Sequence, residues 1–167
     1  YIDKNDYSAV LESLKFPILT RGPEVESFEK NIATYVGAKY AVAVSSCAAG
    51  LHLALMCLDK NKGDQVITSP VSFVSTSNTI LLNDLRPVFT DIDYNTLNID
   101  AKNLLKKKLN KRKAKAIVPV HLTGLATDSK IISKFAKKNK IKIIEDAAHS
   151  FGGKYDCGSI IGSCKYS

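Results

Sequence analysis

The chain has 167 residues, of which 45% are hydrophobic and 24% are charged, and its formal net charge at pH 7 is +8. This length suits one globular domain, so we expect residues 1–167 to form a single domain. No apolar run approaches the roughly 18 residues of a membrane span, and no basic and apolar leader opens the chain. We therefore expect neither a membrane segment nor a signal peptide.

The positive charge is concentrated in two lysine-rich stretches, residues 106–115 and 134–142. Both lie on or just after predicted amphipathic helices, where lysine usually covers the side that faces solvent. The first stretch contains no aromatic residue that could stack on bases. A solvated, lysine-rich surface is therefore favoured over a nucleic-acid interface.

The four cysteines show no spacing that is typical of a zinc site, and the sequence predicts no metal centre. They are Cys47, Cys57, Cys157 and Cys164. Free thiols in a reducing compartment are the simplest interpretation, so we expect a cytoplasmic protein.

Strand-like and helix-like runs alternate along the chain. Helices are predicted over residues 3–14 and 23–37, through Leu51 to Leu58, over 73–82, through Leu104 to Leu109 and through Ile131 to Phe135. Strands are predicted over residues 41–44, 65–68, 87–90, 116–120 and 141–144, with turns and a short hairpin after Gly152. This alternation is typical of an α/β fold, in which helices cover a mainly parallel sheet.

The most informative residue is Asp146, which falls where the predicted strand 141–144 leaves the sheet. In open α/β sheets the carboxyl ends of the strands are where ligands bind. A carboxylate there is costly to bury unless a cationic group meets it. Among the histidines, His149 is the best candidate for a ligand contact, His121 could face the same crevice, and His52 is expected to be structural.

Two other segments could contribute to a ligand site. Residues 45–50, Ser-Ser-Cys-Ala-Ala-Gly, join a predicted strand to a helix through small residues only. Small side chains and a helix N-terminus favour a phosphate, but a tight structural turn would explain the same residues equally well. Phe73 follows another strand end, where an aromatic side chain either packs in the core or offers a flat platform to a ring.

Eight motifs, in order, resemble the DegT-type sugar-nucleotide aminotransferases, which are pyridoxal-phosphate enzymes of the aspartate-aminotransferase fold (fold type I). They are residues 21–29, 35–42, 45–51, 63–67, 72–78, 87–93, 117–121 and 145–150. No single motif is decisive, but eight ordered matches are specific. The resemblance implies a three-layer α/β/α large domain, of which residues 1–167 are the N-terminal portion, ending before the C-terminal part.

The resemblance also implies roles for individual residues in binding the cofactor and the substrate. Asp146 would pair with the pyridine nitrogen of pyridoxal phosphate and keep it protonated, so that the ring acts as an electron sink. The other implied contacts are Phe73 stacked on the ring, His149 near its 3-hydroxyl group, the backbone of Cys47 and Ala48 and the hydroxyl of Ser167 on the phosphate, and Thr20 and Arg21 near the sugar nucleotide.

The family's Schiff-base lysine is expected five residues beyond Ser167, so we expect residues 1–167 to be inactive alone. For the parent protein the resemblance implies transamination of a 4-keto nucleotide-linked deoxysugar for surface glycans such as pseudaminic acid, perosamine or aminoarabinose. Glutamate would be the amino donor and a homodimer the expected state, with no nucleic-acid or membrane partner. The alternatives are a dehydratase of the same family, with histidine in place of that lysine, and a truncated, non-catalytic α/β interaction domain.

Overall fold

The computed structural model describes residues 1–163. The chain forms two compact units, Tyr1–Ala43 and Val44–Ser167. The expectation of a single domain over residues 1–167 stays a prediction.

The first unit contains two helices, α1 (Lys4–Ser13) and α2 (Pro23–Val36). Asp3 caps α1, because its side chain accepts hydrogen bonds from the backbone of the first turn. Pro23 begins α2 and Gly37 ends it with a left-handed φ of 71°, as the sequence predicts. Neither helix buries a residue, so the apolar side of the first predicted helix lies exposed.

The strand predicted over residues 41–44 is wrong. This segment has no regular secondary structure, and Val42 is exposed. A strand needs a neighbouring strand to complete its hydrogen bonds, but the N–H of Ala43 instead donates to the Glu29 carboxylate at 2.7 Å. A side chain of α2 therefore takes the place of a strand partner.

The second unit is built on a four-stranded parallel sheet in the order β2-β1-β3-β4. The strands are β1 (Gln65–Thr68), β2 (Arg86–Phe89), β3 (Ala114–Val118) and β4 (Lys142–Ile143). The helices are α3 (Cys47–Met56), α4 (Ser75–Leu82), α5 (Ala101–Lys106) and α6 (Ser129–Asn139), with a short 3-10 turn, η1 (Leu122–Gly124).

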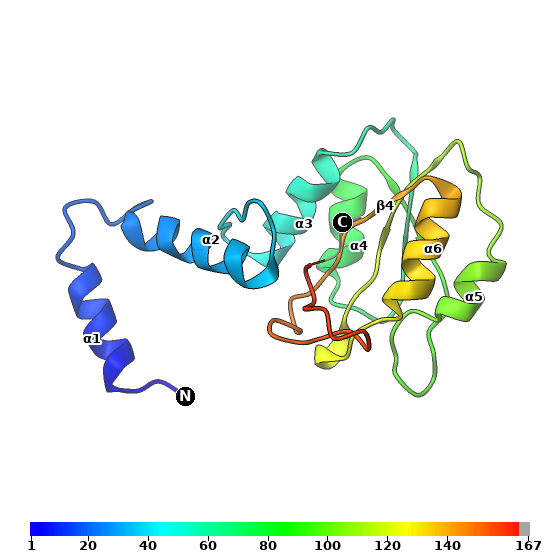
Figure 1. Cartoon of the computed structure of the whole chain (residues 1–167). Helices are drawn as coiled ribbons and strands as arrows, with labels where there is room; N and C mark the ends of the chain where they lie inside the picture. Colours follow the sequence, from blue (N-terminus) through cyan, green and yellow to red (C-terminus); the bar gives the residue numbers. More distant parts are fainter. Residues whose placement is uncertain (164–167) are drawn as a thin grey trace. The chain divides into compact units, whose positions relative to one another are not determined.

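Alternating side chains of the strands form two cores, one on each face of the sheet. Val66 and Val118 pack with α3 and α4 on one face, whereas Ile67 and Ile117 pack with α5 and α6 on the other. Figure 1 shows these helices on the two sides of the strands. This is the expected α/β/α arrangement.

Several predicted boundaries shift by a few residues. The helix predicted through Leu109 ends at Lys106, because the backbone of Lys107 is already extended, and Leu109 instead packs against the core as a loop residue. The predicted C-terminal hairpin is present as an antiparallel bridge between Lys154 and Ile160. None of the helices in residues 1–163 is long and apolar enough to cross a membrane.

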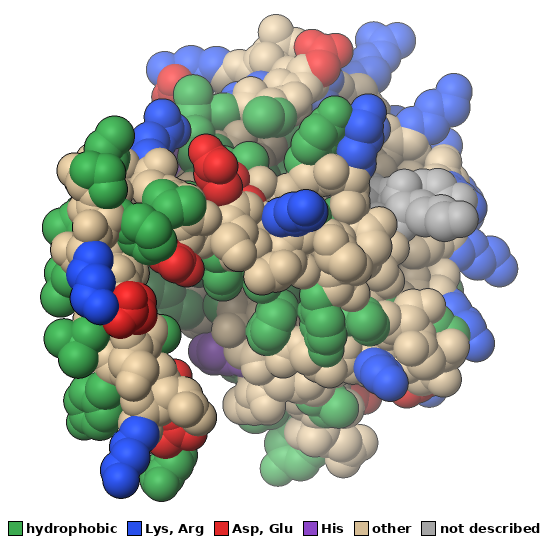
Figure 2. Space-filling model, turned by 60° about the vertical axis from the view of Figure 1, so that its left-hand side comes forward, with side chains coloured by type: hydrophobic (Ala, Val, Ile, Leu, Met, Phe, Trp, Pro, Cys, Tyr) green, Lys and Arg blue, Asp and Glu red, His purple; other side chains and the backbone are tan. Residues whose placement is uncertain are grey.

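The lysines of the second lysine-rich stretch are exposed, as expected for a solvated face; they are Lys134, Lys137, Lys138, Lys140 and Lys142. On the side of the molecule shown in Figure 2, hydrophobic and acidic side chains lie among the Lys and Arg side chains.

Candidate functional site

A pocket of about 130 Å³ lies at the carboxyl ends of the parallel strands of the second unit. It brings together five residues that the sequence singles out, namely Cys47, Phe73, His121, Asp146 and His149. The complete lining is Cys47, Ser72, Phe73, Ser75, Val120, His121, Leu122, Asp146, Ala148 and His149. This is the edge of the sheet at which α/β proteins bind ligands.

The backbone of Asp146 continues the pairing of β3 with β4 beyond the regular strands. Its N–H donates to the Pro119 carbonyl at 2.9 Å, and its own carbonyl accepts from the His121 N–H at 3.0 Å. Because both backbone groups are paired, the position at which the carboxylate leaves the sheet is fixed.

The carboxylate of Asp146 is buried among neutral donors. The residue is 5% exposed, and its Oδ2 accepts a hydrogen bond of 2.7 Å from the hydroxyl of Thr76. Its Oδ1 has longer contacts with the Ala148 N–H at 3.4 Å and the Cys47 thiol at 3.7 Å. No ion pair reaches Asp146 within residues 44–163, so a cationic ligand would supply the charge that this carboxylate lacks.

Small residues begin α3 beside this carboxylate. Ser46 caps the helix, and its hydroxyl accepts from the Ala49 N–H at 3.2 Å. Cys47 and Ala48 are the first two helical residues, so their N–H groups precede the intrahelical hydrogen bonds and suit an anion. Burial, followed by the negative charge of Asp146 and a hydrogen bond to it, raises the pKa of the Cys47 thiol, which therefore stays protonated at neutral pH.

The two ring side chains of the predicted site are accessible. Phe73 is 70% exposed although it lines the pocket, so this ring does not pack in the core and presents a flat apolar face. His149 is also exposed and lies three residues after Asp146. An aromatic ring of a ligand could be held between such groups.

Ala48 follows Cys47 in α3 but is not part of the pocket lining, and three other predicted site residues are not placed relative to this pocket. Thr20 and Arg21 belong to the first unit, where Arg21 adopts a left-handed φ of 56° ahead of α2. Ser167 lies outside the described residues. Their expected roles stay predictions.

The sequence alone did not single out Thr76, which donates a hydrogen bond to Asp146, or Tyr155, which donates one to the adjacent Glu145. Thr76, in the first turn of α4, donates to Asp146 and also contacts Ser72 at 2.6 Å. The signal that could have found it is its place in the first turn of a helix that follows a strand end.

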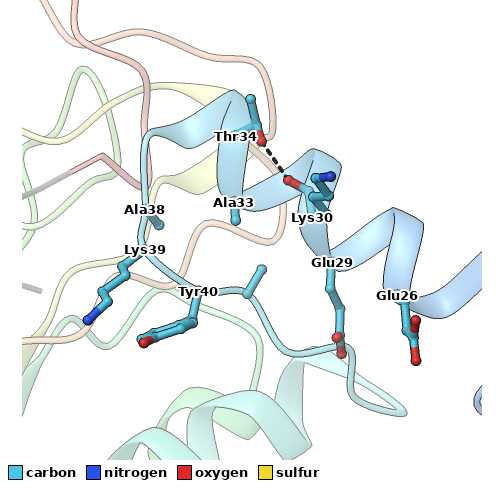
Figure 3. A pocket seen from close by; sticks show the side chains of 9 residues that line it. Glu26, Glu29, Lys30, Ala33, Thr34, Ala38, Lys39 and Tyr40 are labelled. Carbon is cyan, nitrogen blue, oxygen red and sulfur yellow. Dashed lines mark hydrogen bonds between the residues drawn. The ribbon is translucent and has the colours of Figure 1, made fainter.

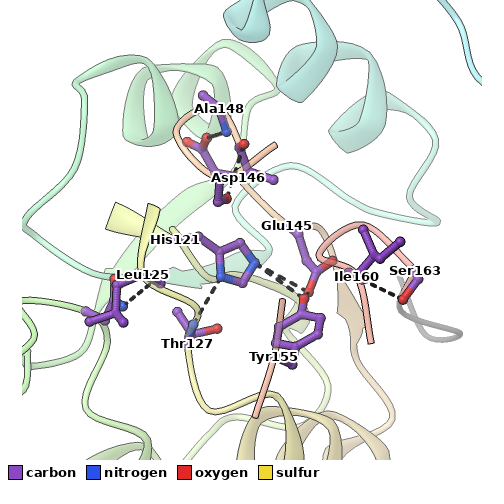
Figure 4. A network of polar contacts seen from close by, with 12 residues as sticks. His121, Leu125, Thr127, Glu145, Asp146, Ala148, Tyr155, Ile160 and Ser163 are labelled. Atoms are coloured by element: carbon purple, nitrogen blue, oxygen red, sulfur yellow. Dashed lines mark hydrogen bonds and ion pairs between the residues drawn. The ribbon is translucent and has the colours of Figure 1, made fainter. Parts of the chain in front are cut away.

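Glu145 has a separate polar network, which Figure 4 shows around His121. Its Oε1 accepts a short hydrogen bond from the Tyr155 hydroxyl and lies 3.5 Å from Nε2 of His121. Burial by itself raises the pKa of Glu145, but its interactions with His121, with Tyr155 and with the backbone of Gly162 together outweigh burial and hold this pKa below its ordinary value. No sequence spacing indicated Tyr155, which reaches the network from the hairpin.

The first unit has a pocket of its own, of about 370 Å³ (Figure 3). Residues of both charges line it, among them Glu29 and Lys39. The carboxylate of Glu29 accepts a hydrogen bond from the backbone N–H of Ala43, and the Lys39 ammonium lies 5.0 Å from the centre of the Tyr40 ring. These contacts stabilise the segment after α2 and give no group that is poised for chemistry.

Comparison with known proteins agrees with this geometry. The chain is 46% identical over 149 residues to the spore coat polysaccharide biosynthesis protein SpsC of Bacillus subtilis, with 89% of the chain and 38% of that protein covered. It is 39% identical over 168 residues to the UDP-4-amino-4-deoxy-L-arabinose–oxoglutarate aminotransferase of Shewanella sediminis, with 99% of the chain and 43% of that protein covered.

Solved structures show the same fold. Helicobacter pylori PseC, an aminotransferase involved in the biosynthesis of pseudaminic acid, matches 95% of this chain with a TM-score of 0.88 and 31% identity, over 43% of its own length. A GDP-4-keto-6-deoxymannose-3-dehydratase that holds PLP and glutamate matches 93% of this chain with a TM-score of 0.86 and 32% identity, over 41% of its length.

The chain thus spans about two fifths of the length of these relatives. The sequence model of one family matches residues 1–165. The chain belongs to the DegT/DnrJ/EryC1/StrS aminotransferase family.

Proposed function

We propose that this chain supplies the cofactor-binding part of an aminotransferase that converts a 4-keto nucleotide-linked deoxysugar to an amino sugar for surface glycans. Enzymes of the family use pyridoxal phosphate, and several of its members are sugar aminotransferases. The observation that carries the proposal is Asp146, a carboxylate that is 95% buried and meets no cation within residues 44–163. A protonated pyridine nitrogen would supply the missing charge.

The residues of the pocket fit pyridoxal phosphate by chemical type. Asp146 would hold the proton on the ring nitrogen, Phe73 would offer its exposed ring to the pyridine, and His149 would lie near the 3-hydroxyl group. The first N–H groups of α3, at Cys47 and Ala48, would bind the phosphate. When bound, the cofactor supplies an electron sink for transamination.

The remaining contacts belong to the proposal too. The hydroxyl of Ser167 would add to the phosphate site, and the segment with Thr20 and Arg21 would meet the sugar nucleotide. Glutamate is proposed as the amino donor, in line with the aminotransferase of Shewanella sediminis, whose name includes oxoglutarate.

We further propose that residues 1–167 form the N-terminal portion of the large domain of a cytoplasmic homodimer. The exposed apolar side chains of Val10 and Leu11 in α1, and of Leu14 directly after it, support burial against another part of the assembly. Free thiols at Cys47, Cys57 and Cys157 in the described part of the chain are in keeping with a reducing compartment.

The experiment is a titration of the complete gene product with pyridoxal phosphate, followed by absorbance. Asp146→Asn keeps the shape of the side chain and removes its charge, so we expect binding to weaken by about a hundredfold, the scale of a broken buried ion pair. Asp59→Asn, at an exposed position, is the matched control and should bind as the unmodified protein does. Equal affinity in the two variants would refute the assignment of Asp146.

A second function is favoured by the likeness to the GDP-4-keto-6-deoxymannose-3-dehydratase. The two reactions leave different products, because transamination adds nitrogen to the sugar and the dehydratase removes a hydroxyl group. Mass spectrometry of the product formed from a 4-keto nucleotide sugar and glutamate distinguishes them. A protein that binds no cofactor at all would instead support the non-catalytic α/β domain.

A further inference from the structure

His121 forms part of the pocket wall, and its two ring nitrogens face different partners. The residue is fully buried, and its Nδ1 lies 3.1 Å from the backbone N–H of Thr127. A backbone N–H can only donate a hydrogen bond, so Nδ1 must accept and carries no proton. The ring proton therefore resides on Nε2, and the imidazole is neutral while this bond holds.

The other nitrogen faces a carboxylate. Nε2 of His121 lies 3.5 Å from Oε1 of Glu145 and 3.5 Å from the Tyr155 hydroxyl, which donates to the same oxygen. A neutral ring with its proton on Nε2 satisfies this arrangement. Nε2 donates to the hydroxyl oxygen of Tyr155, beside the Glu145 carboxylate, while Nδ1 accepts from Thr127. Figure 4 shows His121 between its Thr127 and Glu145 partners.

This arrangement sets the charge near Asp146. His121 and Asp146 line the same pocket, and their backbones are hydrogen-bonded across the ends of β3 and β4. A protonated imidazole in that wall would be a counter-ion for Asp146 and would compete with a cationic ligand. A neutral imidazole leaves the charge of Asp146 available.

We propose that His121 is a positioning residue, held as the neutral Nε2–H tautomer by Thr127 and Glu145. Its neutral ring keeps the pocket wall uncharged, so that Asp146 receives a cationic ring nitrogen. The identity of that ligand rests on the proposed function. The network also joins three segments that are distant in sequence, since Tyr155 comes from the hairpin, Glu145 follows β4 and His121 follows β3.

Nitrogen NMR of the complete gene product, labelled with ¹⁵N-histidine, tests the tautomer without any cofactor. The signals of His121 are identified by their loss in His121→Asn. We expect the pattern of a neutral ring whose proton is on Nε2, because Nδ1 accepts from the Thr127 N–H. A charged ring, or a proton on Nδ1, would overturn the inference.

Cofactor titration tests the consequence for binding. Tyr155→Phe keeps the ring and removes the donor to Glu145, and Tyr94→Phe, at an exposed position, is its control. His121→Gln keeps a donor near Nε2 but loses the Nδ1 acceptor, and His52→Gln is its control. We expect each network variant to bind pyridoxal phosphate about tenfold more weakly, the scale of one hydrogen bond to a charged group, with the controls unchanged.

The outcomes separate the two proposals. Unchanged affinity in both network variants, with the folded state verified by circular dichroism, would overturn the positioning role. Failure of the unmodified protein to bind pyridoxal phosphate would overturn the proposed function and the binding role of His121 with it, and the NMR pattern would still decide the tautomer.

Discussion

The hydroxyl of Thr76 donates a hydrogen bond to the carboxylate of Asp146, on which the proposed site depends. Thr76→Val should therefore lower the free energy of unfolding more than an ordinary threonine substitution does. Thr76 is 1% exposed, and its Oγ1 donates to Oδ2 of Asp146 at 2.7 Å. Valine has nearly the same shape, so the substitution removes this hydrogen bond without opening a cavity. It also leaves the hydroxyl of Ser72 without its contact to Thr76.

The expected magnitude follows from what remains around Asp146. A hydrogen bond to a charged group contributes about 1.5–3 kcal/mol, and loss of a buried partner adds a desolvation cost to the group left behind. The two other contacts of the carboxylate are long, at 3.4 Å to the Ala148 N–H and 3.7 Å to the Cys47 thiol. They therefore compensate little for the lost hydrogen bond from Thr76. We expect Thr76→Val to lower the free energy of unfolding by about 2 kcal/mol.

The assay is urea unfolding of the complete gene product, and the same helix provides the control. Thr79 is also buried, but its hydroxyl makes only a 3.3 Å bond to the neutral carbonyl of Thr76. Thr79→Val should therefore change the free energy of unfolding by about 0.5 kcal/mol or less. If the two variants were destabilised equally, the carboxylate would not be the reason for the cost, and the reasoning would fail.

Two further predictions concern the cap of α3 and the second carboxylate. Ser46→Ala removes the acceptor of the Ala49 N–H and should lower the free energy of unfolding by about 1 kcal/mol. Ser27→Ala, at an exposed position, is the control and should not lower it. Equal unfolding midpoints in the two variants would contradict the role of Ser46 as a cap. Glu145 has a folded-state pKa below its ordinary value of 4.5, so its contribution to stability is present above pH 4.5 and is lost as the pH falls through the folded-state pKa. Glu145→Gln should therefore flatten the acid side of a stability–pH curve, and a flattening of the same size in the exposed Glu24→Gln would refute it.

The elements that sequence predicted best are those whose signals are local. Pro23 and Gly37 mark the two ends of α2 by their own backbone preferences, and the strand over residues 65–68 has the predicted bounds. The placement of Asp146 at the edge of the sheet also follows from local order, because the end of a parallel strand is a ligand-binding position in this fold class.

The parts that sequence did not predict depend on contacts between distant segments. Residues 41–44 are apolar enough for a strand, but a strand also needs a partner, and the Glu29 side chain takes that place at Ala43. Tyr155 and Thr76 reach the site from separate elements, so no spacing within a motif could name them. The roles of the site residues stay predictions.

The adjacent carboxylates Glu145 and Asp146 show why the pocket is suited to a cation. Asp146 is buried and the side chain of Glu145 is 7% exposed, but the two carboxylates receive different partners. Oε1 of Glu145 accepts from Tyr155 and faces the Nε2 of His121, and the pKa of Glu145 is held below its ordinary value. Asp146 has one short hydrogen bond, from a neutral hydroxyl, and faces the pocket. Since the fold stabilises one charge internally and leaves the other beside an open, ring-lined pocket, Asp146 is the carboxylate whose burial a ligand must complete.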